Sequence, residues 1–175
     1  MKRLFSVIFI ILFPYSIVLL LISLFYTTLM KYFFHNNIYI GIFYIGILWI
    51  IALVNAIFIC IKNIINNKNT LETAKVNMII KIMQIPAYLF IFVIGLICMF
   101  TIFTFGISFL LIILDCASIF LTGIVGVSAV KCNYEEKILS SKELFIYSIL
   151  QFVFCADVIS AIILYQKSKS ANILK

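Results

Sequence analysis

Charged side chains are scarce in this sequence: they make up 11% of its 175 residues, whereas 66% are hydrophobic. A soluble domain carries about 25% charged and about 45–50% apolar residues. A water-soluble fold could not cover so much apolar surface, so the composition excludes that class and predicts that the bilayer is the solvent. Arginine, alanine and glycine are also rare, while Ile, Phe, Asn and Lys dominate. This bias is typical of an AT-rich genome and favours a low-GC bacterium.

The groups that build common catalytic and metal sites are missing as well. His35 is the single histidine, and the five cysteines form neither a CxxC pair nor a Cys/His cluster. We therefore expect no metal and no cofactor. The sequence has no phosphate-binding loop, no HExxH and no GxSxG, and its loops are too short for an enzyme domain. From these missing motifs we expect no enzymatic activity. The basic residues do not cluster with exposed aromatics, so we also expect no nucleic-acid binding.

What the sequence does contain is long apolar segments. A membrane-spanning helix needs about 20 apolar residues, and five segments reach that length, at about residues 4–30, 38–61, 78–101, 106–130 and 143–165. We predict an all-α, polytopic transmembrane helix bundle of about five spans, in which residues 1–175 form a single integral membrane domain. The first segment is too long for a signal peptide and has no small-x-small cleavage site after it, so we interpret it as an uncleaved anchor.

The distribution of Lys and Arg predicts the orientation, because cytoplasmic loops are enriched in these residues. With the N-terminus inside, nine basic residues face the cytoplasm and four face outward. The inner set is Lys2, Arg3, Lys62, Lys68, Lys75, Lys81, Lys131, Lys137 and Lys142, and the outer set is Lys31, Lys167, Lys169 and Lys175. The basic tail is the weak point of this topology. It would lie inside only if the fifth segment were interfacial or if one segment did not span.

Local signals place several helix ends. Asn69 followed by Glu72, and Ser140 followed by Glu143, both match a capping box. The first predicts that the third helix begins in the polar loop and enters the membrane near Met78. No charge separates the third and fourth segments, so we expect a tight turn at 104–106.

Two lone aspartates within apolar segments are the best functional clue. Under the five-span topology Asp115 and Asp157 lie at one depth, on consecutive antiparallel helices. A carboxyl group inside a bilayer is costly and needs a partner, a proton or a function. We place no Lys or Arg at that depth and expect Lys81 to extend toward the cytoplasmic end.

Two interpretations of these acids remain open. In one, Asp115 and Asp157 form a proton or cation site that shares a proton, with Ser118, Thr122 and Ser160 as further oxygen ligands. In the other, protonated Asp and neighbouring hydroxyls join the helices structurally. Asn55, Lys81 and Gln84 would form a second polar layer, also interpreted as helix–helix contacts. Small residues at intervals of four predict packing faces: Ala52 and Ala56; Ser118, Thr122 and Gly126; Ala156 and Ser160.

The stretches NMIIKIMQIPAYLFIF and TFGISFLLIILDCASIFLTGIVGVSA, within residues 77–130, and FCADVISAIILY near the C-terminus carry a resemblance. Over about the last 100 residues the chain resembles a family of small membrane proteins of unknown function from low-GC Gram-positive bacteria. The resemblance implies a multi-pass protein of the bacterial cytoplasmic membrane and no particular activity.

Together these patterns lead to two functional hypotheses. The first is a non-enzymatic accessory protein or subunit of a membrane complex of the transport, export or immunity type, packed against a membrane partner or a second copy. The second is a small transporter or channel component that uses Asp115 and Asp157.

Overall fold

The computed structural model describes residues 2–65, 69–100 and 104–173, with the side chains described from residue 6 onward. In these residues the chain forms helices and no strand. The helices are α1 Lys2–Phe25, α2 Thr27–Phe34, α3 Ile38–Ile65, α4 Thr70–Met99, α5 Phe105–Glu135, α6 Ser141–Leu150 and α7 Ala156–Ile173.

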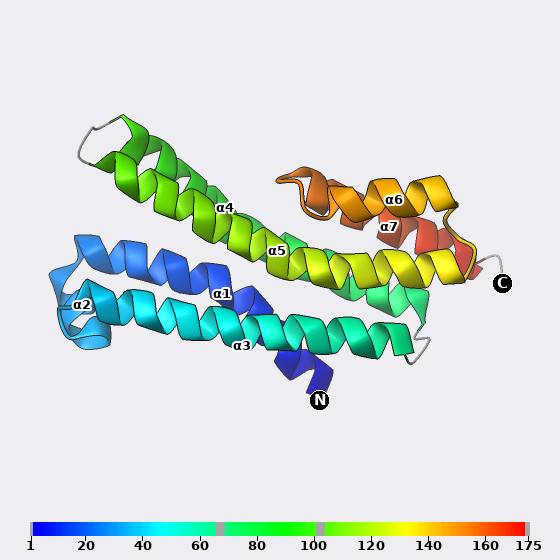
Figure 1. Cartoon of the computed structure of the whole chain (residues 1–175), viewed down its shortest axis with the longest axis horizontal. Helices are drawn as coiled ribbons and strands as arrows, with labels where there is room; N and C mark the ends of the chain where they lie inside the picture. Colours follow the sequence, from blue (N-terminus) through cyan, green and yellow to red (C-terminus); the bar gives the residue numbers. More distant parts are fainter. Residues whose placement is uncertain (1, 66–68, 101–103, 174–175) are drawn as a thin grey trace.

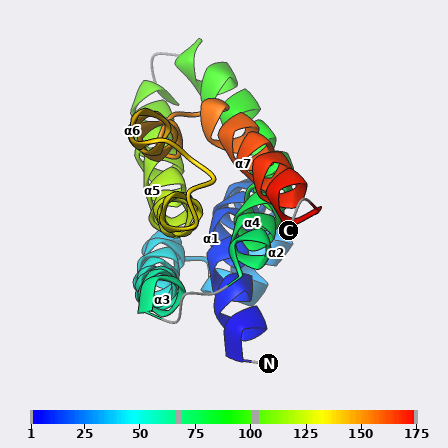
Figure 2. The same cartoon turned by 90° about the vertical axis from the view of Figure 1, so that its right-hand side faces the viewer.

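Four long helices form the body of the bundle, and they run back and forth along its length (Figure 1). Candidate membrane spans lie in α1, α3, α4 and α5, which are long and apolar enough to cross a bilayer. Seen from the end, α1 and α3 lie on one side and α4 and α5 on the other, with α6 and α7 beside the α4–α5 pair (Figure 2). The predicted all-α helical bundle is confirmed, and it is that of an integral membrane protein.

The first predicted segment, 4–30, is not one helix. Helix α1 ends at Phe25, Tyr26 adopts an extended backbone, and a separate eight-residue helix α2 follows. Helix α2 exposes Tyr32 and Phe33 and buries Met30 and Phe34. Aromatic side chains are enriched where a membrane meets water, so α2 has the character of an interfacial helix between two spans.

The predicted helix starts are largely confirmed. The Asn69 side chain accepts a hydrogen bond from the backbone N–H of Leu71 at 3.2 Å, and α4 begins at Thr70. Ser140 and Glu143 form the complete capping box at the start of α6. The turn expected at 104–106 does not lie there, because residues 105 and 106 already belong to α5. Residues 101–103, between Phe100 and Thr104, lie outside the described part of the chain.

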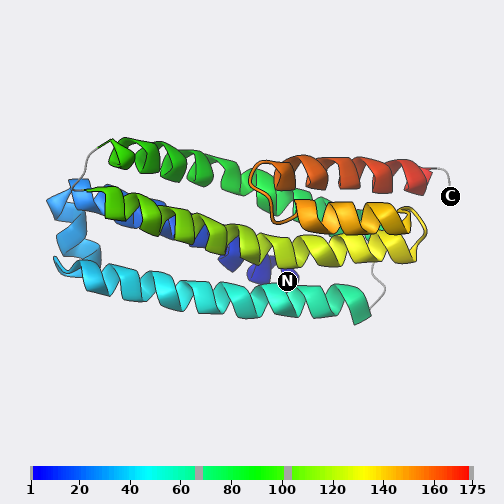
Figure 3. The same cartoon turned by 45° about the horizontal axis from the view of Figure 1, so that its top comes forward.

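The fifth predicted span, 143–165, is wrong as a continuous helix. Helix α6 has ten residues, about 15 Å at 1.5 Å per residue, which is half of a bilayer core. The chain then turns at residues 151–155, where Cys155 has a positive φ of 63°. Helix α7 runs back along α6, so the two form a helical hairpin, here called the α6–α7 hairpin, beside part of α4 and α5 (Figure 3).

The α6–α7 hairpin therefore begins and ends at one end of the bundle. Glu143 of α6 forms an ion pair with Lys167 of α7, and Ser168 donates a hydrogen bond to Asn133 Oδ1 of α5 at 2.6 Å. These contacts hold the last turns of α7 beside the end of α5. The end at which α3 and α5 finish and α4 and α6 begin is called the lysine-rich end below.

This arrangement corrects the predicted side of the tail. Lys167 and Lys169 join the lysines already expected at the lysine-rich end, instead of lying at the opposite end. Lys31 in α2 lies at the opposite end. Lys68 and Lys175 lie outside the described residues. The described lysines are thus divided between the two ends more unevenly than the sequence-based topology implied, which is the asymmetry that the positive-inside rule describes.

The Glu143–Lys167 pair makes the hairpin base sensitive to acid. The hydrogen bond from Lys167, with those from Ser140, lowers the pKa of Glu143 from 4.5 to about 2. A carboxylate whose pKa is depressed on folding contributes stability above its unfolded pKa and loses it as pH falls. We expect this contribution to disappear between about pH 4.5 and 2, so the detergent-solubilised wild type should lose more Tm over this window than Glu143→Gln does. The exposed Lys131–Glu135 pair, 3.8 Å apart, supplies the control variant Glu135→Gln. An equal loss in wild type and Glu143→Gln would contradict the assignment.

Candidate functional site

A buried ion pair lies where the tip of the α6–α7 hairpin meets α4. Lys81 Nζ is 2.9 Å from Asp157 Oδ2, and the two side chains are 0% and 3% exposed. Lys81 also donates to the backbone carbonyl of Gln151 at 3.2 Å. Each buried charge is thereby paired, which is the condition under which ionised groups are tolerated away from water.

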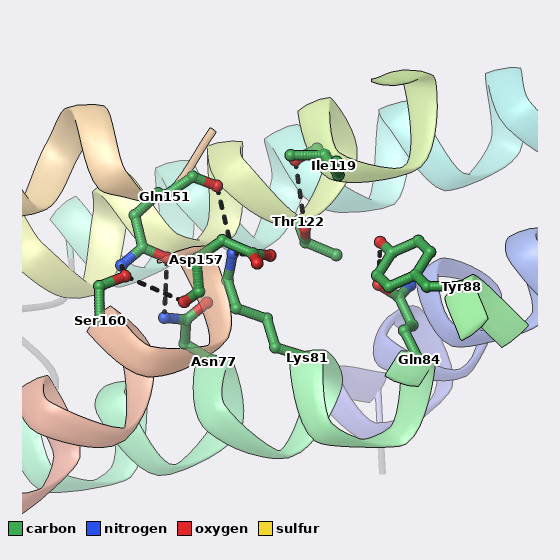
Figure 4. A network of polar contacts seen from close by, with 9 residues as sticks. All are labelled: Asn77, Lys81, Gln84, Tyr88, Ile119, Thr122, Gln151, Asp157 and Ser160. Atoms are coloured by element: carbon green, nitrogen blue, oxygen red, sulfur yellow. Dashed lines mark hydrogen bonds and ion pairs between the residues drawn. The ribbon is translucent and has the colours of Figure 1, made fainter. Parts of the chain in front are cut away.

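Amide and hydroxyl groups extend this pair into a network (Figure 4). Gln151 is central: its Oε1 accepts from Asn77 Nδ2 at 3.3 Å and its Nε2 donates to Ser160 Oγ at 3.0 Å. Ser160 in turn donates to the carbonyl of Asp157 at 2.9 Å. Asn77, Lys81, Gln151 and Ser160 are all at most 1% exposed. The network thus joins both arms of the α6–α7 hairpin to one face of α4.

Two glycines of α5 make room for the hairpin tip. A Cβ at Gly126 would lie 2.1 Å from Gln151 Oε1, and a Cβ at Gly123 would lie 2.3 Å from the Phe152 ring. Both distances are far below van der Waals contact, so only glycine permits this approach. The tip is therefore held between the polar face of α4 and the glycine face of α5.

The structure overturns one premise about the aspartates. A lysine does lie beside Asp157: Lys81 points into the bundle and is fully buried, instead of extending toward the membrane surface. The sequence carried a signal for this orientation, because Asn77, Lys81, Gln84 and Tyr88 recur at intervals of four, three and four, which puts them on one helix face. Gln151 was not predicted as a site residue, because its role depends on the turn at residues 151–155, for which the sequence carries no local signal.

Further polar side chains join helices elsewhere in the bundle, and one of the predicted residues, Asn55, does not. Gln84 Nε2 donates to the carbonyl of Ile10 in α1 at 2.8 Å, and Tyr88 donates to Gln84 Oε1 at 2.7 Å. Asn55 instead donates to Ile51 O within its own helix. Near the lysine-rich end Asn63 Nδ2 donates to Ser128 Oγ at 2.9 Å and joins α3 to α5.

The hydroxyls proposed as ion ligands are engaged with backbone groups. Ser118 donates to Leu114 O and Thr122 to Ile119 O, each at 3.1 Å and each within α5. Ser160 belongs to the network around Gln151. Of the predicted ligand set, the structure places Ser160 beside Asp157 and puts Ser118 and Thr122 on the buried face of α5. Among the described residues no group of three or more His, Cys, Asp or Glu side chains gathers.

The small-residue faces are buried where they were expected to pack. Ala52 and Ala56 of α3 are 0% exposed, as are Ser118 and Thr122 of α5. Gly126 of α5 is buried as well. Ala156 is half-buried at the start of α7. Gly126 contacts Gln151, so this position serves the hairpin.

Asp115 is not joined to Asp157. It is half-buried on α5, where its Oδ1 is buried and has no hydrogen-bond partner among the described residues. It lines a cavity of about 90 Å³ between α4 and α5, together with Phe92, Gly95, Ser108 and others. The hydroxyl of Ser108 is directed to the carbonyl of Gly95, 2.9 Å away. Asp115 therefore differs from Asp157: within the described part of the chain no lysine pairs with it.

A larger cavity of about 300 Å³ opens beside the hairpin tip. It is lined by residues of α4 and of the hairpin: Ile85, Tyr88, Leu89, Phe92, Phe154, Cys155, Asp157 and Val158. The Phe154 ring contacts Tyr88 and Phe92, each with centroids 6.2 Å apart. Phe92 lines both cavities, the smaller one with Asp115 and the larger one with Asp157.

Comparisons of this chain with protein-family models, with curated proteins and with solved structures found no match.

Proposed function

We propose that this multi-pass protein is a non-enzymatic subunit or accessory protein of a membrane complex of the transport, export or immunity type. We place it in the bacterial cytoplasmic membrane, with the lysine-rich end toward the cytoplasm. The observation that carries the proposal is the buried Oδ1 of Asp115, which has no hydrogen-bond partner in the described part of the chain. An intramembrane acid requires compensation, and a subunit obtains it from a neighbouring chain.

The surface around Asp115 supports this proposal. Large apolar side chains next to it on α5 and across the cavity on α4 are exposed; they include Ile112, Ile113, Phe92, Leu96 and Met99. This side of the α4–α5 pair is therefore accessible from within the bilayer. Hairpin residue Phe152 contacts the Phe120 ring, with centroids 6.1 Å apart. Asp115 lies five residues before Phe120, about 7.5 Å nearer the start of α5, on the part of the helix beyond the hairpin tip.

The test is purification of the tagged, full-length protein from its native host in a mild detergent. We expect a defined partner in fixed stoichiometry, identified by mass spectrometry and by the mass of the complex in native conditions. A monodisperse single-copy species after cross-linking in the membrane would contradict the subunit proposal.

The cavity at Asp115 favours one second candidate, a transport component that binds a proton or cation. About 90 Å³ is enough space for water next to a carboxyl group. In this candidate Asp115 carries the function and Asp157 holds the structure, since Lys81 already neutralises Asp157. Ion flux in liposomes tests it: Asp115→Asn should abolish the flux with folding intact, and unchanged flux would rule Asp115 out.

A further inference from the structure

The chain compensates its two intramembrane acids differently, and the difference indicates what Asp115 needs. Asp157 on the hairpin is neutralised by Lys81 on α4, with 2.9 Å between Nζ and Oδ2. Asp115 carries the same carboxyl group within a candidate membrane span but has no such partner among the described residues. Opposite charges in a low-dielectric medium attract strongly, so a cation is the natural complement of an ionised Asp115.

No described lysine of this chain is free to supply that cation. Lys81 is buried and engaged with Asp157 and Gln151. The other described lysines lie in or beside the terminal turns of helices, on α2 or in the loops: Lys31, Lys62, Lys75, Lys131, Lys137, Lys142, Lys167 and Lys169. Asp115 lies ten residues inside α5, about 15 Å from its start. A second copy of the chain would therefore bring another aspartate to this depth and, from its described residues, no spare lysine.

Resting on the function proposed above, we propose that the α4–α5 face around Asp115 binds a transmembrane helix of a different protein, which carries Lys or Arg at the depth of Asp115. Charge complementarity identifies the occupant, and the apolar side chains around the cavity form the remainder of the contact. The cavity of about 90 Å³ beside Phe92, Gly95 and Asp115 offers space for the end of one long side chain.

The chain contains a natural probe for this contact. Cys116 adjoins Asp115 and is exposed. With Cys60, Cys98, Cys132 and Cys155 replaced by Ser, a photo-activated cross-linker attached to Cys116 reports the helix next to Asp115 in native membranes. We expect the cross-link to fall in another protein's transmembrane segment, within one helical turn of a Lys or Arg.

Substitution then tests the charge. Asp115→Asn keeps the shape of the side chain and removes its charge, so we expect recovery of the partner to fall by about tenfold or more. Glu135→Gln is the matched control: it removes a carboxylate charge from the other end of α5, outside the cavity, and recovery should be unchanged. Asp115→Lys combined with the partner's Lys→Asp or Arg→Asp should restore recovery.

The outcomes separate the two proposals. Unchanged recovery with Asp115→Asn, or a cross-linked helix without a basic residue, overturns this inference and leaves the subunit function standing. A cross-link between two copies of the chain also overturns it, in favour of a shared proton. Absence of any partner overturns both proposals.

Discussion

Replacing Lys81 with Met is expected to lower the free energy of unfolding by about 3–5 kcal/mol, because it leaves the Asp157 carboxylate buried without its partner. Met has a similar length and adds no void, so the loss reports the missing charge and its hydrogen bonds. Asp157 would have to gain a proton or draw in water, and either change weakens the attachment of the hairpin tip to α4. Equilibrium unfolding in detergent micelles or bicelles measures the loss.

The double variant Lys81→Met with Asp157→Leu serves as the control. Replacing both members of a buried ion pair with apolar groups is often close to neutral, so this variant should be more stable than Lys81→Met alone. Such a recovery defines a positive coupling between the two positions. If the two single losses simply added, Lys81 and Asp157 would not form the pair described here.

Gly126→Ala is expected to lower the free energy of unfolding by about 1–3 kcal/mol, the usual effect of overpacking a buried contact. The new methyl group would overlap Gln151 Oε1, at 2.1 Å. Gln151 is 0% exposed and holds Asn77 and Ser160 through its side chain, so it cannot move without losing those bonds. The hairpin should also become easier to cleave at its tip by protease in detergent.

Gly46→Ala is the matched control, because it lies inside α3 and a Cβ there would meet nothing within 4 Å. Alanine favours a helix interior over glycine by about 1 kcal/mol, so this variant should be as stable as the wild type or more stable. A Gly126→Ala protein that behaves like Gly46→Ala would show that Gln151 does not pack against α5.

Much of the fold follows from the length of the apolar segments. The apolar segments around Trp49, Gln84 and Asp115 are each long enough to span a membrane, and each forms a single long helix. Ser140 and Glu143 were predictable as a cap, because the motif is local and its hydrogen bonds are made within one turn.

The fifth segment could not be predicted from local signals. Residues 143–165 contain neither glycine nor proline, and their apolar length suits a span. The chain turns because distant residues compensate the turn: Lys81 donates a hydrogen bond to the backbone carbonyl of Gln151, and Gly126 leaves room for the Gln151 side chain. Cys155 then takes a positive φ that side chains normally avoid.

The residues of the candidate site could be picked out from the sequence, but their arrangement could not. Asp115 and Asp157 stood out in the sequence as intramembrane acids, and the face of α4 with Lys81 and Gln84 was readable from its spacing. Their relative depth was not, because it was derived from a fifth span. Because α7 begins at the hairpin tip, Asp157 forms an ion pair with Lys81. Asp115 lies on the α4–α5 face, and its buried Oδ1 has no partner among the described residues.

The central claim, that the α6–α7 hairpin returns to the end from which it started, is tested most directly by the sidedness of single cysteines. In a chain whose own cysteines are replaced by Ser, one new cysteine is introduced as Ser170→Cys, Lys75→Cys or Tyr39→Cys. The native side chains at these three positions are exposed. A membrane-impermeant maleimide is applied to intact and to permeabilised cells. We expect Ser170→Cys and Lys75→Cys to react alike and Tyr39→Cys to react from the opposite side. If Ser170→Cys reacted together with Tyr39→Cys, residues 143–165 would cross the membrane and the hairpin would be ruled out.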